Sequence, residues 1–324
     1  MRAWWLDTND KDAHTELRET ALPEPGPRQL LVRVRAAGLN RGEFIIGGLT
    51  KAGTAKPLGI EGAGEVVKAG AEVRRFAPGA RVMGRFAGAL ADYVLANEAD
   101  AMAIPDKLSW EEAGAMPTTY MVAHDMLVLQ GGLRAGGWLL VTGVASGVGV
   151  ASLQLAKALG ARVIGTSGSR EKLARLQPLG LDVAVCTRTP DFQAQVMDAT
   201  GGAGVNLVVN NVGGTVFAEC VRCLAFEGRL ATVGYVDGVL KSEIDLQVLH
   251  AKRLVLFGVS QKMTSPAQKA EGVRRFEQEM LPLAAQGRLR PLIDRVFAFD
   301  ALPAARAHME ANAHVGKIVI QGGP

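Results

Sequence analysis

Residues 138–159 read WLLVTGVASGVGVASLQLAKAL, an apolar run followed by a glycine-containing turn and an amphipathic stretch. This order is typical of a strand, a tight turn and a helix that together bind a phosphate group. Gly147 and Gly149 carry no Cβ, so the backbone of the turn can approach a pyrophosphate closely. The helix expected from Val148 onward would direct its free N–H groups and its positive dipole end at the phosphates. Ser146 adds a hydroxyl that can donate a further hydrogen bond.

The next apolar run, ARVIGTS at 161–167, ends in small polar residues and not in a carboxylate. A site for NAD usually places Asp or Glu at this point to bind the ribose 2′-hydroxyl, whereas a 2′-phosphate is bound by cations and hydrogen-bond donors. The sequence therefore predicts NADPH as the cofactor. In the alternative interpretation, Arg170 and Lys172 are solvated residues of a helix surface. The candidate phosphate ligands are Ser167, Gly168, Ser169, Arg170, Lys172 and, after the third expected strand, Arg188.

The elements that would position these residues alternate regularly from about residue 120 to residue 260. Near-continuous apolar runs are separated by helical stretches, and this alternation predicts a parallel sheet covered on both faces. Six strands of this kind predict a Rossmann doubly wound fold. The expected strands are 138–143, 161–167, 183–187, 205–212, 229–235 and 253–260, and the expected helices are 148–159, 169–177, 190–199, 215–226 and 244–250.

Short strand-like segments with turns between them dominate the first 117 residues, which predicts a partly closed antiparallel β-barrel. Ser109 and Glu112 have the spacing of a capping box at the start of a helix. We expect the barrel domain to consist of residues 1–118 and 262–324, with the Rossmann domain inserted at 119–261.

The C-terminal part of the chain contains two further expected helices. Ser265-Pro266 provides a cap and a proline at the first helical position of a helix that is expected to run to Gln286, where Gly287 ends it. A strand at 292–299, a helix at 301–312 and a strand at 316–321 follow it.

The composition excludes several classes of protein. The chain has 324 residues with 36 lysines and arginines against 32 aspartates and glutamates, a net charge of +4 without long basic runs, so nucleic-acid binding is not predicted. Three cysteines cannot make a disulfide framework and favour a reducing compartment. The charged first twenty residues and the interrupted apolar stretch 138–156 predict neither a secretory signal nor a membrane span. We therefore expect a soluble cytoplasmic protein.

The glycine turn also resembles the Thr-Gly-x-x-x-Gly-x-Gly pattern of the short-chain dehydrogenases. That family needs Tyr-x-x-x-Lys on a helix, because the tyrosine donates a proton and the lysine lowers its pKa. None of the three tyrosines, Tyr93, Tyr120 and Tyr235, has a lysine four residues later. This interpretation is excluded.

A second resemblance extends over nearly the whole chain. The segments VRAAGLNRGEF, GIEGAGEV, VTGVASGVGVASLQLAKALGARVIGTSGSREK, VVNNVGG and AHMEANAHVGKIVIQ stand in family order at 34–44, 59–66, 141–172, 208–214 and 307–321. The chain resembles the zinc-free, zeta-crystallin-like quinone oxidoreductases of the medium-chain dehydrogenase/reductase family. The resemblance implies a GroES-like catalytic domain around the Rossmann domain, and a homodimer.

The same resemblance implies residues for the nicotinamide half of the cofactor and for catalysis. Asn40 and Tyr235 are the catalytic candidates. Lys317 is a further candidate for the cofactor site, and its alternative is a capping or surface lysine. Glu61 is expected to hold a strand turn and not to take part in catalysis. The implied nicotinamide-site residues are Asn40, Asn211, Val233, Gly234, Tyr235, Phe257, Gly258 and Val259.

Two tyrosines of the family pattern are replaced here. Thr187 and Arg188 stand where an aromatic ring is expected near the adenosine phosphate, and Arg188 could substitute for it by charge. The residues Phe44, Ile45 and Ile46 stand where a tyrosine is expected in the substrate pocket, which predicts a more apolar pocket.

Metal ligands of the related alcohol dehydrogenases are also missing. Catalytic zinc in those enzymes is bound by a cysteine near position 38 and by the histidine of a Gly-His-Glu segment. Here Gly38 and Ile60 stand at these positions, and the cysteine lobe that binds structural zinc is absent. Cys220 and Cys223 form a C-x-x-C inside an expected helix, where buried core residues are favoured over redox partners.

Without a Lewis acid, the favoured reaction is hydride transfer from NADPH to a small molecule that is electrophilic by itself, a quinone or an α,β-unsaturated carbonyl compound. Two alternatives remain from the sequence. One is a non-catalytic protein that binds or senses NADPH, and the other is an alcohol dehydrogenase.

Overall fold

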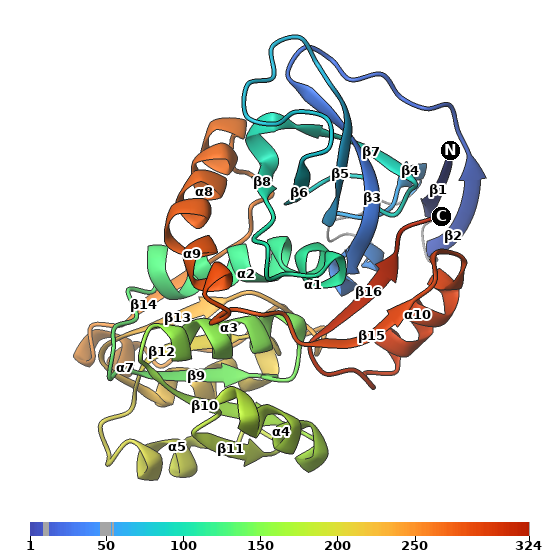
Figure 1. Ribbon diagram of the computed structural model, residues 1–324. Helices are drawn as coiled ribbons and strands as arrows, with labels where there is room; N and C mark the ends of the chain where they lie inside the picture. Colours follow the sequence, from blue (N-terminus) through green and yellow to red (C-terminus); the bar gives the residue numbers. More distant parts are fainter. Residues whose placement is uncertain (9–12, 46–52, 54, 324) are drawn as a thin grey trace. The chain divides into compact units, whose positions relative to one another are not determined.

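The computed structural model describes residues 1–8, 13–45, 53 and 55–323, and the chain divides into two compact units (Figure 1). The first unit consists of Met1–Met121 and Lys262–Pro324, and the second is Val122–Gln261. Ile46, whose side chain was predicted to make the pocket more apolar, lies outside the described residues.

A parallel sheet forms the centre of the second unit (Figure 1). In the described residues its strands lie in the order β11-β10-β9-β12-β13-β14, which corresponds to 3-2-1-4-5-6 in chain order. This is the strand order of a Rossmann fold, and the predicted fold class is confirmed for this unit. The strands are β9 (Trp138–Thr142), β10 (Arg162–Ser167), β11 (Val183–Cys186), β12 (Val205–Asn210), β13 (Leu224–Thr232) and β14 (Val255–Gly258).

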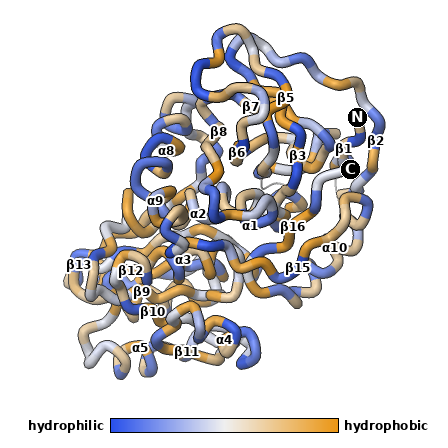
Figure 2. Tube along the Cα trace, viewed as in Figure 1, coloured by the Kyte–Doolittle hydropathy of each residue, from blue (hydrophilic) through white to orange (hydrophobic). Residues whose placement is uncertain are grey.

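Both faces of this sheet are buried. Leu140 and Val208 belong to a hydrophobic core that also contains Phe192 and Cys220, whereas Leu139, on the opposite face of β9, is equally inaccessible. Hydrophobic residues run along these strands in Figure 2. The covering helices are α3 (Gly147–Ala158), α4 (Arg170–Leu176), α5 (Gln193–Ala199), α6 (Phe217–Arg222) and α7 (Leu246–Ala251).

The first unit contains a largely antiparallel sheet in the order β15-β16-β3-β5-β6-β8, with β7 paired to β3, and a smaller sheet β2-β1-β4. Strand β16 from the C-terminal segment pairs with β3, and Ile318 lies opposite Leu39. The strands are β1 (Arg2–Thr8), β2 (Ala13–Glu19), β3 (Gln29–Leu39), β4 (Ala55–Pro57), β5 (Gly62–Ala69), β6 (Arg81–Gly84), β7 (Tyr93–Asn97), β8 (Ala101–Ala103), β15 (Ile293–Phe297) and β16 (Lys317–Gln321).

Two helices of the first unit, those that follow Ser109 and Ser265, begin with the predicted caps. The Ser109 Oγ accepts a hydrogen bond from the Glu112 N–H, and the Glu112 carboxylate accepts one from the Ser109 N–H. Ser265 caps its helix in the same way, with Gln268 as its partner. The helices are α1 (Trp110–Ala115), α2 (Pro117–His124, which continues into the second unit), α8 (Pro266–Glu279), α9 (Leu281–Ala285) and α10 (Leu302–Glu310).

Two predicted helices are wrong in extent. The helix expected to reach Gln286 is divided into α8 and α9, because Pro282 lacks the N–H that a continuous helix would use. The helix expected at 215–226 ends at Arg222, and β13 begins at Leu224. Cys223 therefore caps α6 instead of lying inside it.

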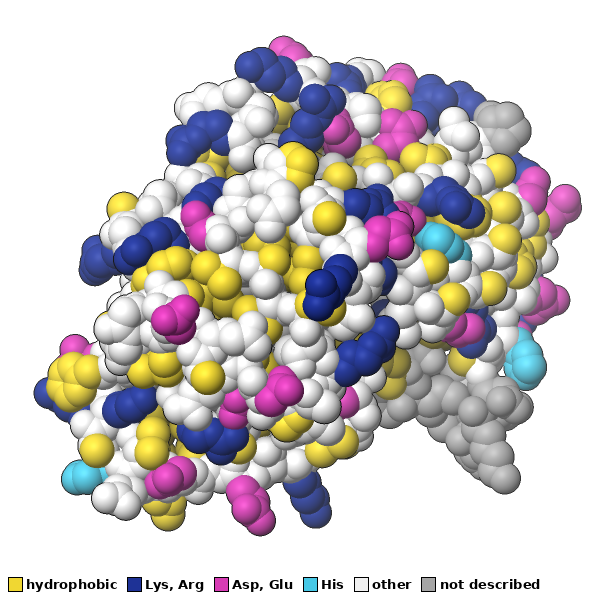
Figure 3. Space-filling model, turned by 90° about the horizontal axis from the view of Figure 1, so that it is seen from below, with side chains coloured by type: hydrophobic (Ala, Val, Ile, Leu, Met, Phe, Trp, Pro, Cys, Tyr) yellow, Lys and Arg dark blue, Asp and Glu magenta, His cyan; other side chains and the backbone are white. Residues whose placement is uncertain are grey.

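Charged side chains of both signs are interspersed on the face drawn in Figure 3. None of the helices in the described part of the chain combines the length and the apolar character that crossing a bilayer requires.

Candidate active site and cofactor-binding turn

The predicted glycine turn connects β9 to α3, and α3 begins at Gly147, one residue before the predicted start. Ser146 is the N-cap, and its Oγ accepts a hydrogen bond of 3.1 Å from the Gly149 N–H. A Cβ atom on Gly149 would lie 2.5 Å from the carbonyl oxygen of Val144, so this glycine is required by the packing of the turn itself. The hydroxyl proton of Ser146 is not used in the cap and can still be donated to an anion.

Val144 stands where the dinucleotide-binding pattern usually has glycine, and Gly165 in the neighbouring strand makes room for its side chain. The Val144 side chain is fully buried, and a Cβ atom on Gly165 of β10 would lie 2.7 Å from Val144 Cγ1. The space that a glycine would leave in the turn is thus filled by valine, and a glycine in the neighbouring strand accommodates it.

The end of β10 brings together the residues predicted to bind a 2′-phosphate. Ser169 is the N-cap of α4, and its Oγ accepts a hydrogen bond of 3.3 Å from the Lys172 N–H. A Cβ atom on Gly168 would lie 2.7 Å from Arg188 Cγ, so the Arg188 side chain lies directly against this glycine. Both Arg170 and Arg188 are exposed, and neither forms an ion pair within the described residues.

The ends of two strands of the second unit, β9 and β12, are tied together by Thr142. The Asn211 Nδ2 donates to the carbonyl oxygen of Thr142 at 2.9 Å, and the Asn211 N–H donates to Thr142 Oγ1 at 3.1 Å. Asn210, which the sequence analysis did not single out, accepts from Thr142 Oγ1 and from the N–H groups of Val212 and Gly213. Its side chain is completely buried and shapes the loop after β12.

The segment after β13, which contains Val233, Gly234 and Tyr235, is held by an aspartate that the sequence analysis missed. The Asp237 carboxylate accepts hydrogen bonds from the N–H and Oγ1 of Thr215 and from the Val239 N–H. Burial opposes ionisation of Asp237, but these hydrogen bonds outweigh it and lower the pKa of the carboxyl.

The remaining nicotinamide-site candidates of this unit lie at the end of β14 and after β13. Phe257 and Gly258 are the last residues of β14, and Val259, which follows, is buried. Tyr235 is 53% exposed, and its hydroxyl has no hydrogen-bond partner among the described residues.

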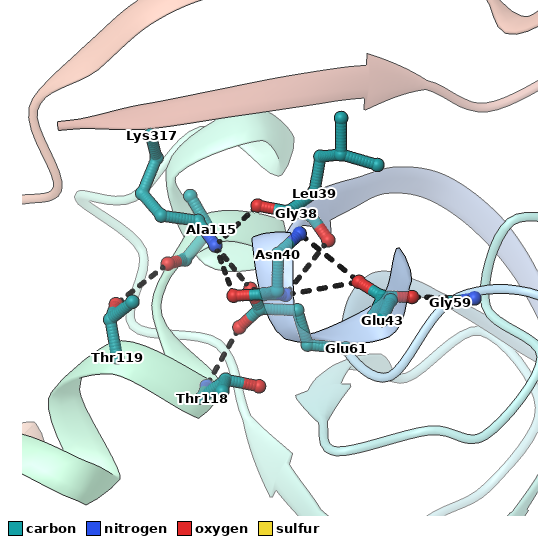
Figure 4. A network of polar contacts seen from close by, with 10 residues as sticks. All are labelled: Gly38, Leu39, Asn40, Glu43, Gly59, Glu61, Ala115, Thr118, Thr119 and Lys317. Carbon is teal, nitrogen blue, oxygen red and sulfur yellow. Dashed lines mark hydrogen bonds and ion pairs between the residues drawn. The ribbon is translucent and has the colours of Figure 1, made fainter. Parts of the chain in front are cut away.

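Lys317 occupies the centre of a polar network in the first unit (Figure 4). Its ammonium donates to Glu61 Oε1 at 2.7 Å, to Asn40 Oδ1 at 2.8 Å and to the carbonyl oxygen of Leu39 at 3.1 Å. The side chain of Lys317 is 5% exposed, so the alternative of a surface lysine is wrong. These three acceptors use all three N–H groups, which leaves none for direct contact with a cofactor.

Glu61 is the anionic partner of this lysine and is fully buried. Its Oε1 also accepts a hydrogen bond of 2.9 Å from Asn40 Nδ2, and its Oε2 accepts one of 2.7 Å from the Thr118 N–H at the start of α2. Glu61 therefore accepts hydrogen bonds from the first turn of α2 and from the Asn40 amide, which is a structural role. A Cβ atom on Gly38 would lie 2.4 Å from Glu61 Oε1, so glycine is required there.

Asn40 uses both of its amide N–H groups inside this network. Besides its bond to Glu61, the Nδ2 donates to the carbonyl oxygen of Gly38 at 3.2 Å. Both N–H groups of Asn40 therefore have acceptors in this structure, and its catalytic role stays a prediction.

Glu43 is a second buried carboxyl beside Asn40. Its Oε1 accepts a hydrogen bond of 3.0 Å from the Asn40 N–H, and its Oε2 accepts one of 2.9 Å from the Gly59 N–H. Burial and, to a smaller extent, the negative charge of Glu61 raise the pKa of Glu43 from its ordinary 4.5 to about 7, although Lys317 and Asn40 oppose this rise.

Glu43 should make the protein less stable as the pH rises from about 4.5 to about 7. In this range the folded protein holds a proton on Glu43 that the unfolded chain releases, so ionisation at higher pH favours unfolding. At ~1.4 kcal/mol per pH unit the contribution is roughly 3 kcal/mol. Urea unfolding at about pH 4.5 and about pH 7 should show this loss of unfolding free energy in the wild type and not in Glu43→Gln. Parallel pH profiles for the two proteins would contradict the prediction.

The donor groups of this region do not fit a metal ion. Gly38 and Ile60 provide no ligand atoms, and the carboxylate of Glu61 is bound by an ammonium and N–H groups. Across the described ranges, no group of three or more His, Cys, Asp and Glu side chains is arranged to hold a metal.

Cys220 and Cys223 are both buried, as the sequence analysis favoured. Burial is the main cause that raises the pKa of Cys220 well above its ordinary value and that of Cys223 to about 12. Both thiols are therefore protonated near neutral pH and are poor nucleophiles.

Two known families match this chain. Residues 26–128 match the family described as "Alcohol dehydrogenase GroES-like domain", and residues 147–278 match "Zinc-binding dehydrogenase".

Polyketide synthase proteins are among the curated relatives. The chain is 33% identical over 297 residues to spectinabilin polyketide synthase system protein NorB of Streptomyces orinoci, which covers 91% of this chain and 13% of that protein. It is also 33% identical over 294 residues to erythronolide synthase EryA2 of Saccharopolyspora erythraea, with 90% of this chain and 8% of that protein covered. The chain thus spans a small part of the length of these relatives.

Solved structures match over the whole chain. An NAD-dependent alcohol dehydrogenase is 30% identical with a TM-score of 0.87, and 100% of both chains is covered. A mycobacterial protein in complex with NADPH is 26% identical with a TM-score of 0.89, covering 99% of this chain and 100% of the other. A quinone oxidoreductase of Pseudomonas syringae is 25% identical with a TM-score of 0.85, again covering 99% and 100%.

These likenesses agree with the architecture described above. A GroES-like match, a dehydrogenase match and full-length similarity at 30% identity coincide with a Rossmann sheet inserted between the two segments of a largely antiparallel unit. The chain belongs to the medium-chain dehydrogenase/reductase family of oxidoreductases.

Proposed function

We propose that this protein is an NADPH-dependent reductase that transfers a hydride to a quinone or to a carbon–carbon double bond conjugated with a carbonyl group, without a catalytic metal. The observation that carries the proposal is the Lys317–Glu61 ion pair beside Asn40, in the segments where the zinc relatives have their ligands. An electrophilic acceptor needs no Lewis acid, whereas an alcohol does. Similarity to a quinone oxidoreductase supports this choice of acceptor.

The cations at the end of β10 support NADPH over NADH. Arg188 lies against Gly168, Arg170 follows Ser169, and neither guanidinium is neutralised by an ion pair within the described residues. A doubly charged 2′-phosphate would provide these groups with charge-assisted hydrogen bonds. One structural relative was solved with NADPH, although another is named NAD-dependent.

The residues of the chain would hold the cofactor in two parts. Ser146, Gly147, Val148 and Gly149 provide the start of α3 for the pyrophosphate, and the loops after β12, β13 and β14 provide the nicotinamide site. When bound, the reduced nicotinamide supplies the hydride.

Tyr235 is the best remaining candidate to meet negative charge on the reduced substrate. Asn40 has no unused N–H group, whereas the exposed Tyr235 hydroxyl has no partner within the described residues. A phenol can donate a hydrogen bond to an enolate or hydroquinone oxygen.

Replacing Tyr235 with phenylalanine should lower kcat by roughly 10- to 100-fold, the effect of removing one hydrogen bond to a charged group. The KM for NADPH should change by less than about twofold, since the ring remains. Steady-state kinetics with a quinone and with an enone would measure both values. Tyr93→Phe, in the first unit, is the matched control and should leave kcat unchanged. Equal kcat values for the wild type and Tyr235→Phe would show that Tyr235 takes no part in catalysis.

The direct test of the proposed function is NADPH consumption measured with 9,10-phenanthrenequinone, an enal and an enone. Consumption with one of these classes in zinc-free protein supports the proposal. Tight NADPH binding without any consumption would instead support a non-catalytic binding protein. Stoichiometric zinc needed for alcohol oxidation would support an alcohol dehydrogenase.

We further propose that the protein forms a homodimer through β14. This strand is at the end of the sheet order, and Val255 on β14 is 39% exposed, with Phe226 61% exposed on the neighbouring β13. An edge strand with exposed apolar side chains is suited to pair with a second copy. Val255→Lys should convert a dimer to a monomer in light scattering, whereas Val296→Lys, on the edge strand β15, should not. A wild-type monomer would contradict this prediction.

A further inference from the structure

Two segments at the carboxyl edge of the parallel sheet are joined to each other, and one of them carries Tyr235. Residues 211–215 follow β12, and residues 233–239 follow β13. The Asp237 N–H donates a hydrogen bond of 3.0 Å to the carbonyl oxygen of Val212. The position of the Tyr235 backbone therefore depends on the segment that follows β12.

Further main-chain hydrogen bonds close the segment that carries Tyr235. The Gly238 N–H donates to the carbonyl oxygen of Tyr235 at 3.0 Å, which forms a turn. The Gly214 N–H donates to the carbonyl oxygen of Val239 at 2.9 Å. The backbone around Tyr235 is thus held at several points, whereas its side chain is exposed.

The Asp237 side chain joins the same two segments a second time. Its Oδ2 accepts hydrogen bonds from the N–H and the Oγ1 of Thr215 at 2.8 and 2.6 Å, and its Oδ1 accepts one of 2.9 Å from the Val239 N–H. These bonds lower the pKa of the Asp237 carboxyl and keep it ionised near neutral pH. An ionised carboxylate has no proton to give, so any effect of Asp237 on catalysis must pass through another residue.

Gly213 makes room for this carboxylate and has a backbone conformation that other residues rarely adopt, with φ of 128° and ψ of −148°. A Cβ atom on Gly213 would lie 2.1 Å from Asp237 Oδ1. The buried Asn210 side chain holds the same residue, because its Oδ1 accepts from the Gly213 N–H at 3.1 Å and its Nδ2 donates to the Gly213 carbonyl oxygen at 2.9 Å. Such conformations persist only where the surroundings enforce them, and they are frequent at functional sites.

We propose that Asp237 is a positioning residue, which holds Tyr235 in place for catalysis by joining its segment to Thr215. This inference rests on the proposed function, in which the Tyr235 hydroxyl meets negative charge on the reduced substrate. Asp237 acts through Tyr235 and transfers no proton of its own. Without the carboxylate, the Tyr235 hydroxyl should lose its fixed position, and kcat should fall.

Asp237→Asn tests this role with little change in the size of the side chain. Every group that the structure describes as bonded to this carboxylate is a donor, so the new NH₂ group must face an N–H or O–H of Val239 or Thr215. With a quinone or an enone, kcat should fall about 3- to 10-fold, the equivalent of one hydrogen bond. The KM for NADPH should change by less than about twofold, because the cations after β10 are unaltered.

Two variants of Thr215 and one control accompany this change. Thr215→Ser keeps the hydroxyl and should retain the wild-type kcat, whereas Thr215→Val removes it at equal size and should lower kcat in the same direction as Asp237→Asn. Asp245→Asn is the matched control, because Asp245 also accepts from two backbone N–H groups, those of Gln247 and Val248 at the start of α7. It should leave kcat unchanged.

A double-mutant cycle separates positioning from a purely structural role. If Asp237 acts through Tyr235, Asp237→Asn should lower kcat by less than about twofold when Tyr235→Phe is already present. If Asp237 only stabilises the protein, the losses of the two single variants should multiply. An unchanged kcat in Asp237→Asn, or multiplied losses in the double variant, would overturn the inference.

Hydrogen exchange tests the order of the segment without an assay of activity. The N–H groups of Asp237, Gly238 and Val239 all have acceptors, so a peptide that covers them should be protected from deuterium exchange in the wild type. Protection should fall in Asp237→Asn and should remain in Thr215→Ser and Asp245→Asn. Equal protection in the wild type and Asp237→Asn would also overturn the inference.

The outcomes distinguish this inference from the proposed function. Wild-type protein that consumes NADPH with none of the acceptors would overturn the proposed function and, with it, the role of Asp237 in catalysis. Wild-type protein that is active, with the same kcat as Asp237→Asn, would overturn this inference alone. Protection of the wild-type segment shows in either case that the protein tested is folded.

Discussion

Replacing Arg170 and Arg188 with alanine should weaken NADPH binding by about 100-fold or more, while NADH binding should change by less than about twofold. Each guanidinium can form charge-assisted hydrogen bonds of roughly 1.5–3 kcal/mol to a 2′-phosphate, and NADH lacks that group. Both arginines are exposed, so their removal should not disturb the fold. Calorimetric titration of both cofactors would measure the change.

The control for this prediction removes two other exposed arginines of the same unit. Arg134→Ala with Arg175→Ala should affect NADPH by much less, because only weak long-range attraction is lost. Equal affinities of wild-type protein for NADH and NADPH, or an equal loss for both cofactors in the double alanine variant, would show that these arginines do not bind a 2′-phosphate.

Replacing Lys317 with methionine should lower the free energy of unfolding by about 3–5 kcal/mol. The substitution leaves the carboxylate of Glu61 buried without its counter-charge, which is far more costly than exchanging the pair for neutral groups. Adding Glu61→Gln should recover most of the loss. Chemical unfolding monitored for both variants would give the two differences.

Lys107→Met is a suitable control for this series, since Lys107 is exposed and its loss should change stability by no more than about 0.5 kcal/mol. If Lys317→Met were as stable as Lys107→Met, Glu61 would not carry an uncompensated charge in that variant.

The parallel sheet was the part of the fold that the sequence predicted best. β9 is buried at every position and β12 at every position except Asn206, and their largely apolar sequences are visible without any knowledge of the fold. Helix ends were predicted less well, because they depend on local backbone geometry. Glu227, with a φ of 57°, lies in β13 directly after the predicted end of the helix, and its sequence context gives no sign of that conformation.

The candidate site was predictable to the extent that it is local in sequence. The turn before α3 and the cations after β10 follow directly from short motifs. The partners of Lys317 are 256 to 278 residues away, and no periodicity or spacing rule connects positions so distant. Asp237 was not predicted for the same reason, since its partner Thr215 is 22 residues away in the sequence.

The pairing of β16 with β3 has a consequence for the time at which the Asn40 network can form. During synthesis β3 is translated first, residues 122–261 follow, and β16, which carries Lys317, is translated after them. The inserted sheet can therefore form on the nascent chain before Lys317 is available to pair with Glu61. Contacts of such long range also slow folding, so we expect acquisition of the Lys317 contacts to be among the last events of chain maturation.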